Sequence, residues 1–130
     1  MLTGRVLTVW EPDGLQMQIV EPFTFTDAAG RVWPVPAGFV TDGASIPRAL
    51  WSIVGSPFTG AYRVAGVLHD SAYSQLGVTK NDADNMLREA AMDSGCEWWL
   101  AESIYAGVRV GGLGPYSESQ REAANIKGST

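Results

Sequence analysis

The chain has 130 residues, of which 45% are hydrophobic and 18% charged, with a formal net charge of −5 and one cysteine. This length suits a single domain that buries a core without disulfides or a structural metal. An acidic chain without a run of lysine or arginine is not expected to bind nucleic acid, because such binding depends mainly on contacts to phosphates. The lone Cys96 argues against a disulfide framework and a cysteine-based zinc site.

The first ten residues, MLTGRVLTVW, lack the charged start, apolar run and small-residue cleavage site of a secretory signal. No window of the sequence approaches the length of a transmembrane segment. A lone thiol is typical of proteins that fold under reducing conditions. We therefore expect a cytoplasmic protein.

The first part of the chain predicts short β-strands. Residues 4–10 and 15–21 are rich in branched side chains and are joined by the turn sequence EPDG. Residues 23–33 predict a hairpin whose turn is the sequence DAAG. Pro34 and Pro36 cannot donate hydrogen bonds to a neighbouring strand, so this strand ends there or lies at a sheet edge.

The second part of the chain predicts helices. Residues 47–54 form a short helix with proline at its first position. Apolar residues recur at helical spacing in residues 61–76, 80–94 and 96–110, and a glycine follows each of the first two of these segments. The sequence TKND before the second segment resembles a capping box. Residues 113–130 are polar and are expected to form a partly docked tail.

These elements predict an α+β fold: an N-terminal antiparallel sheet of about four short strands, followed by a bundle of about three helices. Neither an internal repeat nor a linker divides the chain. We expect one domain over residues 1–112 and a polar C-terminal tail over residues 113–130.

The only histidine, His69, lies in the stretch VLHDSAY, on the apolar face of its predicted helix. Tyr73 follows one helical turn later on the same face. Asp70 lies about 100° further round the helix, so its carboxylate does not orient the imidazole. The partner that orients His69 must therefore come from another segment.

The helix predicted over residues 80–94 offers this partner. Because the connection over residues 77–79 is short, the two helices should pack antiparallel, and Asp84 could then reach His69. Asp82 is the alternative, although its place in the first turn suits capping. A carboxylate that accepts one imidazole N–H fixes the tautomer and leaves the other nitrogen as a general base. In the competing interpretation, His69 satisfies a hydrogen bond in the core and has no chemical role.

The sequence TDGASIP, residues 41–47, is a second candidate site. As structure it is a tight turn that leads into a helix, whereas as a site Asp42 and nearby carbonyl groups would offer oxygen ligands to calcium. A triad of Ser45 with His69 and its aspartate is geometrically possible, but the sequence around the serine is not a nucleophile elbow. Cys96 has the character of a small apolar residue rather than a nucleophile.

Several motifs in order, FVTDGASIPRALW, LHDSAY, DADNML and YAGVRVGG, resemble a small domain-of-unknown-function family encoded by tailed phages and prophages. The similarity covers about residues 20–112. It implies a phage-encoded protein in the host cytoplasm or incorporated in the virion, with other virion or assembly proteins as partners. It implies no particular chemistry.

The sequence HDSAY also resembles the His-Asp-x-x-Tyr helix of calcium-dependent secretory phospholipases. This similarity implies that His69 is the general base, oriented by Asp84, with Tyr73 as a hydrogen-bond partner behind it. It implies further that Asp70 and Asp42 are calcium ligands, and that the calcium ion polarises the ester carbonyl and stabilises the oxyanion. The chain lacks the disulfides and the glycine-rich loop of that class.

Two functions follow from these resemblances. The first is a phage virion or assembly protein in which the pair of His69 and Asp84 holds two helices together. The alternative is a calcium-assisted hydrolase of envelope lipids or similar esters, for which contact with a membrane surface is expected. The enzymatic function requires calcium, and the structural function requires no cofactor.

Overall fold

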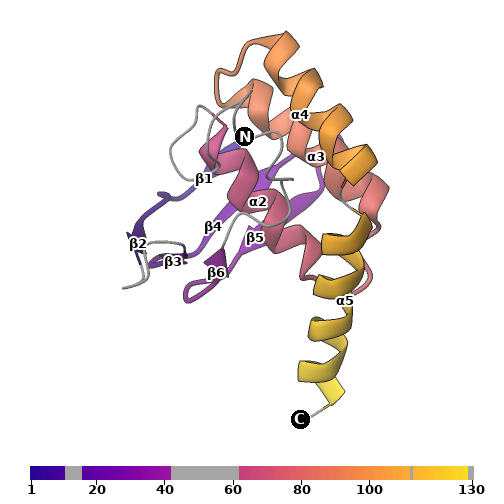
Figure 1. Cartoon of the computed structure of the whole chain (residues 1–130). Helices are drawn as coiled ribbons and strands as arrows, with labels where there is room; N and C mark the ends of the chain where they lie inside the picture. Colours follow the sequence, from indigo (N-terminus) through magenta and orange to yellow (C-terminus); the bar gives the residue numbers. More distant parts are fainter. Residues whose placement is uncertain (11–15, 42–61, 112, 129–130) are drawn as a thin grey trace.

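The computed structural model describes residues 1–10, 16–41, 62–111 and 113–128. Within these ranges, six short strands come first: β1 (Leu2–Thr3), β2 (Thr8–Trp10), β3 (Met17–Ile19), β4 (Phe23–Thr26), β5 (Val32–Val35) and β6 (Val40–Thr41). Four helices follow among the described residues: α2 (Arg63–Tyr73), α3 (Lys80–Asp93), α4 (Trp98–Gly111) and α5 (Leu113–Gly128). The α+β class is therefore confirmed, and Figure 1 shows the strands gathered on one side of the helices.

The described strands form two small antiparallel sheets rather than one sheet of about four strands, in the orders β1-β4-β5 and β2-β3-β6. Of the segment predicted as one strand over residues 4–10, only residues 8–10 form a strand, and β1 lies before the segment, directly ahead of Gly4, which has a φ of +96°. A Cβ atom at this position would lie 3.2 Å from the Cβ of Phe23, so the close approach of the two segments requires glycine. β6 adds a further short strand to β3.

The predicted hairpin of β4 and β5 is confirmed. Asp27 closes its turn, because one carboxylate oxygen accepts the backbone N–H of Arg31 at 2.9 Å and the other accepts the indole N–H of Trp33 at 3.1 Å. Gly30 supplies the positive φ of the turn, +89°. Pro34 lies in β5, an edge strand, as its missing N–H predicts.

The helices begin close to the predicted residues. The hydroxyl of Thr79 accepts the backbone N–H of Asp82 and caps α3, as the sequence predicts. α2 ends at Tyr73, three residues earlier than expected, and Leu76 is exposed beyond it. α4 buries three residues, Ala101, Ile104 and Val108. The short helix predicted over residues 47–54 lies outside the described residues.

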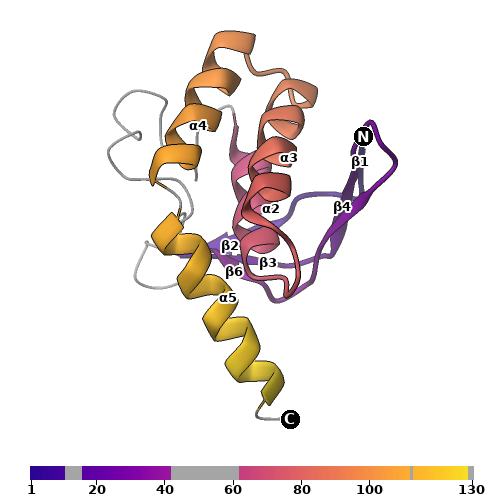
Figure 2. The ribbon, with the colours of Figure 1, turned by 90° about the vertical axis from the view of Figure 1, so that its right-hand side faces the viewer.

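The bundle contains one helix more than expected, because residues 113–128 form α5. Its first half docks through the hydroxyl of Tyr116, which donates to the carbonyl of Val78 at 2.6 Å. The amide of Gln120 donates to the carbonyls of Tyr73 and Gln75. The rest of α5 extends away from the other helices (Figure 2). A domain boundary near residue 112 stays a prediction.

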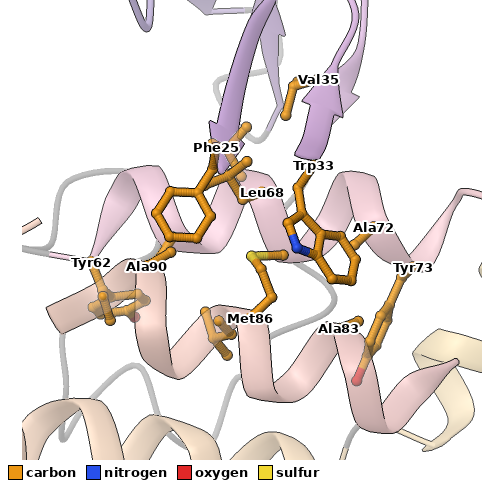
Figure 3. Close-up of a cluster of buried hydrophobic side chains, with 14 of the residues drawn as sticks. Phe25, Trp33, Val35, Tyr62, Leu68, Ala72, Tyr73, Ala83, Met86 and Ala90 are labelled. Carbon is orange, nitrogen blue, oxygen red and sulfur yellow. The ribbon is translucent and has the colours of Figure 1, made fainter. Parts of the chain in front are cut away.

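The core lies between the β4–β5 hairpin and the helices (Figure 3). Alternate residues of the two strands, Phe25 and Trp33 among them, turn a buried face toward α2 and α3. Leu68 of α2 and Met86 of α3 meet these aromatic rings. The helices α2, α3 and α4 pack side by side, so α3 is in contact with both of the others. No helix in the described parts of the chain is both long and apolar enough to cross a membrane.

Candidate functional site

The stretch VLHDSAY forms the second half of α2, and every residue in it is buried. His69 has no exposed area. The ring of Tyr73 follows one turn later, with its centroid 4.1 Å from that of the imidazole. The two rings therefore share the face of α2 that packs against α3, as the helical periodicity predicts.

Asp84 of α3 binds both side chains through one oxygen. His69 Nε2 lies 2.7 Å from Oδ1 of Asp84, and the hydroxyl of Tyr73 donates to the same oxygen at 2.6 Å. The predicted contact between His69 and Asp84 is confirmed. The alternative pairing of His69 with Asp82 is wrong, because the Asp82 side chain is 49% exposed and forms an ion pair with Arg31.

The second oxygen of Asp84 binds two cations that the sequence analysis did not identify. Lys80 Nζ donates to Oδ2 at 2.7 Å, and Arg109 Nη1 donates to it at 3.3 Å. Lys80 also donates to the carbonyl of Val108 at 2.9 Å and so connects α3 to α4. Lys80 and Asp84 are four residues apart on α3, a spacing that favours an ion pair and could have revealed this contact. We refer to His69, Tyr73, Lys80, Asp84 and Arg109 as the Asp84 cluster.

The electrostatics of the cluster determine where the proton of the imidazole lies. Burial alone would raise the pKa of Asp84, but hydrogen bonds from His69, Lys80 and Tyr73 lower this pKa to about 2. Burial lowers the pKa of His69 below its ordinary value, more than the carboxylate of Asp84 raises it. Asp84 is thus ionised and His69 neutral at pH 7. Because a carboxylate only accepts hydrogen bonds, Nε2 carries the imidazole proton and Nδ1 carries none.

The other nitrogen of His69, Nδ1, is buried and has no hydrogen-bond partner in the part of the chain that the structure describes. Buried polar atoms are nearly always paired in folded proteins, and an exception calls for a physical explanation. An unprotonated Nδ1 opposite an oriented Nε2–H is an arrangement that a general base can use.

Asp70 faces away from the imidazole, as expected from its position on α2. It is buried, accepts a hydrogen bond from the hydroxyl of Thr41 and lines a cleft of about 680 Å³ together with Ser74 and residues of α5. Asp42, the other predicted calcium ligand, lies outside the described residues. Within the described ranges, no three histidine, cysteine or acidic side chains are grouped closely enough to hold a metal ion. The predicted calcium pair of Asp42 and Asp70 therefore stays a prediction.

The two candidate nucleophiles gain no support from the structure. Ser45 lies outside the described residues, so a triad with His69 is not tested. Cys96 is buried, and burial raises the pKa of its thiol, the opposite of what activates a cysteine nucleophile.

The chain matches the family described as a protein of unknown function, DUF1353, over residues 17–108. It belongs to the DUF1353 family. The match includes His69, Tyr73, Lys80 and Asp84, and it ends one residue before Arg109.

Two relatives of the chain come from Sinorhizobium fredii (strain NBRC 101917 / NGR234). The uncharacterized protein y4jT is 38% identical over 91 residues, which are 70% of this chain and 27% of that protein. The uncharacterized protein y4iH is 31% identical over 86 residues, 66% of this chain and 36% of that protein. The chain thus spans about a third or less of the length of these relatives. No solved structure matches it significantly.

Proposed function

We propose that this DUF1353 domain carries a hydrolytic site in which Nδ1 of His69 is the general base. The observation that carries this proposal is the buried Nδ1, which has no hydrogen-bond partner among the described residues, on an imidazole whose Nε2 lies 2.7 Å from Oδ1 of Asp84. In such a site a water molecule that reaches the buried Nδ1 gives it a proton, and the water oxygen attacks the carbonyl carbon of an ester. When the tetrahedral intermediate collapses, the C–O bond of the ester breaks and the imidazolium returns the proton to the departing alkoxide. The ionised Asp84 stabilises the imidazolium that forms.

The surroundings of the pair support this proposal. Oδ1 of Asp84 accepts a hydrogen bond from Tyr73 and lies 2.7 Å from Nε2 of His69. The resemblance to calcium-dependent phospholipases implies an aspartate that orients His69 and a tyrosine behind it, so these contacts support the proposal. In the same proposal Asp70 contributes to a calcium site that polarises the ester carbonyl. The substrates of such a site are envelope lipids or similar esters.

The test compares hydrolysis by the wild-type protein, by His69→Asn and by the matched control Asp82→Asn. The probes are a small activated ester and anionic phospholipid vesicles, each with and without calcium. A general base contributes a factor on the order of 10² to 10⁴, so His69→Asn should lose this factor while Asp82→Asn keeps the wild-type rate. Equal rates for wild type and His69→Asn, with both proteins folded at the assay temperature, would contradict the proposal.

We propose a second function, a phage virion or assembly protein, because α4 exposes large apolar side chains at both of its ends. Trp98 and Trp99 are 70% and 53% exposed at its start, and Val110 is 88% exposed near its end. Large apolar side chains that gather on a surface can mark contacts with partner proteins. In this function the Asp84 cluster acts only to join α2, α3 and α4, in the host cytoplasm or in the particle.

Particle assembly tests the second function. If it is correct, Val110→Lys should reduce incorporation of the protein into phage particles without changing its melting temperature. His69→Asn should then affect assembly only through the amount of folded protein. A hydrolytic rate that depends on His69, together with unchanged incorporation of Val110→Lys, would favour the first function.

A further inference from the structure

Helix α4 has a buried face and an exposed face. Ala101, Ile104 and Val108 form the buried face, and the helix packs against α3. In Figure 2, α4 lies on the side of α2 and α3 that faces away from β1 and β4. The exposed face of α4 is therefore a surface on which a partner can dock.

Four exposed residues form a seam along this face. They are Trp99, Ser103, Ala106 and Val110, at intervals of four, three and four residues. An α-helix turns by about 100° per residue, so all four fall within about 60° of one another, opposite to the buried face. Trp99 and Val110 are 53% and 88% exposed. Helices that pack along one another use this spacing, and we refer to the four residues as the α4 seam.

The side-chain sizes of the α4 seam fit a second copy of the same seam. Large side chains, Trp99 and Val110, stand at its two ends, and small ones, Ser103 and Ala106, stand between them. Both pairs are centred on the same point of the helix. A two-fold axis at that point runs a second α4 antiparallel to the first, with Trp99 of each copy against Val110 of the other. Ser103 then faces Ala106, and two small side chains allow the helix axes to approach closely.

The charges beside the α4 seam match in the same arrangement. Glu102 and Arg109 lie on one flank of the seam, about 60° and 80° round the helix from Trp99. Their side chains are 48% and 39% exposed. The two-fold axis places Arg109 of one copy about 3 Å along the helix from the level of Glu102 in the other copy, on the same flank. A parallel pair would instead place like charges side by side, which is unfavourable.

We propose that the α4 seam joins two copies of this chain in an antiparallel dimer with two-fold symmetry. The inference names a partner for the surface used in the second proposed function, and it rests on that function for the use of the dimer in assembly. Two helices of 14 residues are in contact over about 21 Å, an interface at the small end of the range for specific complexes. We therefore expect a reversible dimer that forms at about micromolar concentrations or above.

Sedimentation equilibrium of the full chain between about 1 μM and about 1 mM measures the pairing. The wild type should pass from monomer to dimer over this range. Val110→Lys should raise the dissociation constant at least about tenfold, because a charged side chain replaces an apolar one that packs against Trp99 of the other copy. Ala106→Lys should do the same, because a long side chain prevents the close approach of the two helices.

Met92→Lys is the matched control. Met92 is also apolar and exposed, at 44%, but it lies on α3 outside the α4 seam. This variant should keep the wild-type dissociation constant. A wild type that stays monomeric up to about 1 mM, or a dissociation constant that Val110→Lys leaves unchanged, would overturn the inference.

Disulfide formation tests the direction of the pair, in protein whose buried Cys96 is replaced by alanine. Ser103→Cys and Ala106→Cys proteins are oxidised separately and as a mixture. The antiparallel pair should link position 103 of one copy to position 106 of the other, so the mixture should form dimers faster than either protein alone. Faster linkage of each protein to itself would indicate a parallel pair and overturn the inference.

Particle assembly separates this inference from the function on which it rests. A dimer that Val110→Lys weakens, with unchanged incorporation of this variant into phage particles, would support the dimer and reject the use of α4 in assembly. Loss of incorporation in Val110→Lys while the wild type stays monomeric would overturn the dimer and indicate a different protein on the α4 seam.

Discussion

At the scale of single residues, His69 is where the structure departs most from an ordinary core. The imidazole is fully buried and has one nitrogen without a partner among the described residues. Such a group lowers stability, since burial of an unpaired polar atom costs about 1–3 kcal/mol. The proposed role of His69 as a general base would explain why the protein keeps this unpaired nitrogen beside Asp84.

The buried histidine predicts an acid-sensitive protein. The pKa of His69 is lowered by folding, so below pH 6.5 the unfolded chain binds a proton that the folded protein does not. The free energy of unfolding should therefore fall as the pH falls below 6.5, by up to about 1.4 kcal/mol per pH unit. Asp84 causes a second fall in the free energy of unfolding as the pH drops from 3.8 to about 2, because folding lowers the pKa of this carboxyl group as well.

Urea unfolding of the wild type and His69→Gln between pH 7.5 and 5 measures the first effect. His69→Gln lacks the titrating group, so the stability difference between the two proteins should shift in favour of the variant as the pH falls. A difference that stays constant over this range would show that folding leaves the pKa of His69 unchanged.

At the scale of elements, the Asp84 cluster joins three helices. His69 and Tyr73 come from α2, Lys80 and Asp84 from α3, and Arg109 from α4. β5 packs against α2, and β4 lies on the opposite side of α2 and α3 from α4 (Figure 2). The position of the site is thus set by helix packing and not by a loop.

The role of Asp84 in joining the helices is tested by comparing substitutions of two aspartates of α3. Asp84→Asn leaves the part-buried Lys80 without its ion pair, a change that typically costs about 3–5 kcal/mol. Asp82→Asn removes an exposed ion pair with Arg31, which is worth less than about 1 kcal/mol. Urea unfolding at pH 7 should show a larger loss in the free energy of unfolding for Asp84→Asn than for Asp82→Asn. Equal losses of stability in the two variants would contradict the role of Asp84 in joining the helices.

The sequence predicts part of this site because the relevant signals are local. Helical spacing places His69 and Tyr73 on one face, and the short connection to α3 brings Asp84 to that face. Arg109 lies 25 residues further on, and its reach depends on how α4 crosses α3, which no local pattern encodes. The close approach of Gly4 to Phe23 and the pairing of β6 with β3 are likewise contacts between distant parts of the chain, and no local pattern predicts them.

At the scale of the whole molecule, the chain is similar to stretches that make up 27% and 36% of two longer relatives. The chain therefore resembles a unit within these longer proteins. Whether that unit binds calcium affects the stability of the entire fold, because a ligand that binds only the folded state stabilises it.

Calcium binding is measured by the melting temperature of the full chain. If Asp70 is a ligand, calcium at 100 times its dissociation constant should add about 2.7 kcal/mol to the free energy of unfolding. Magnesium should add less, and Asp70→Asn should lose the shift. The same rise in Asp70→Asn as in the wild type would remove Asp70 from the calcium site.

The pH titration of the imidazole nitrogens in the wild-type protein shows directly whether His69 is held as a neutral base with an unprotonated Nδ1. We expect a proton on Nε2 and none on Nδ1 at pH 7 and above, and protonation of the ring only below the ordinary histidine pKa of 6.5. An imidazolium at pH 7, or a neutral ring with its proton on Nδ1, would contradict this expectation.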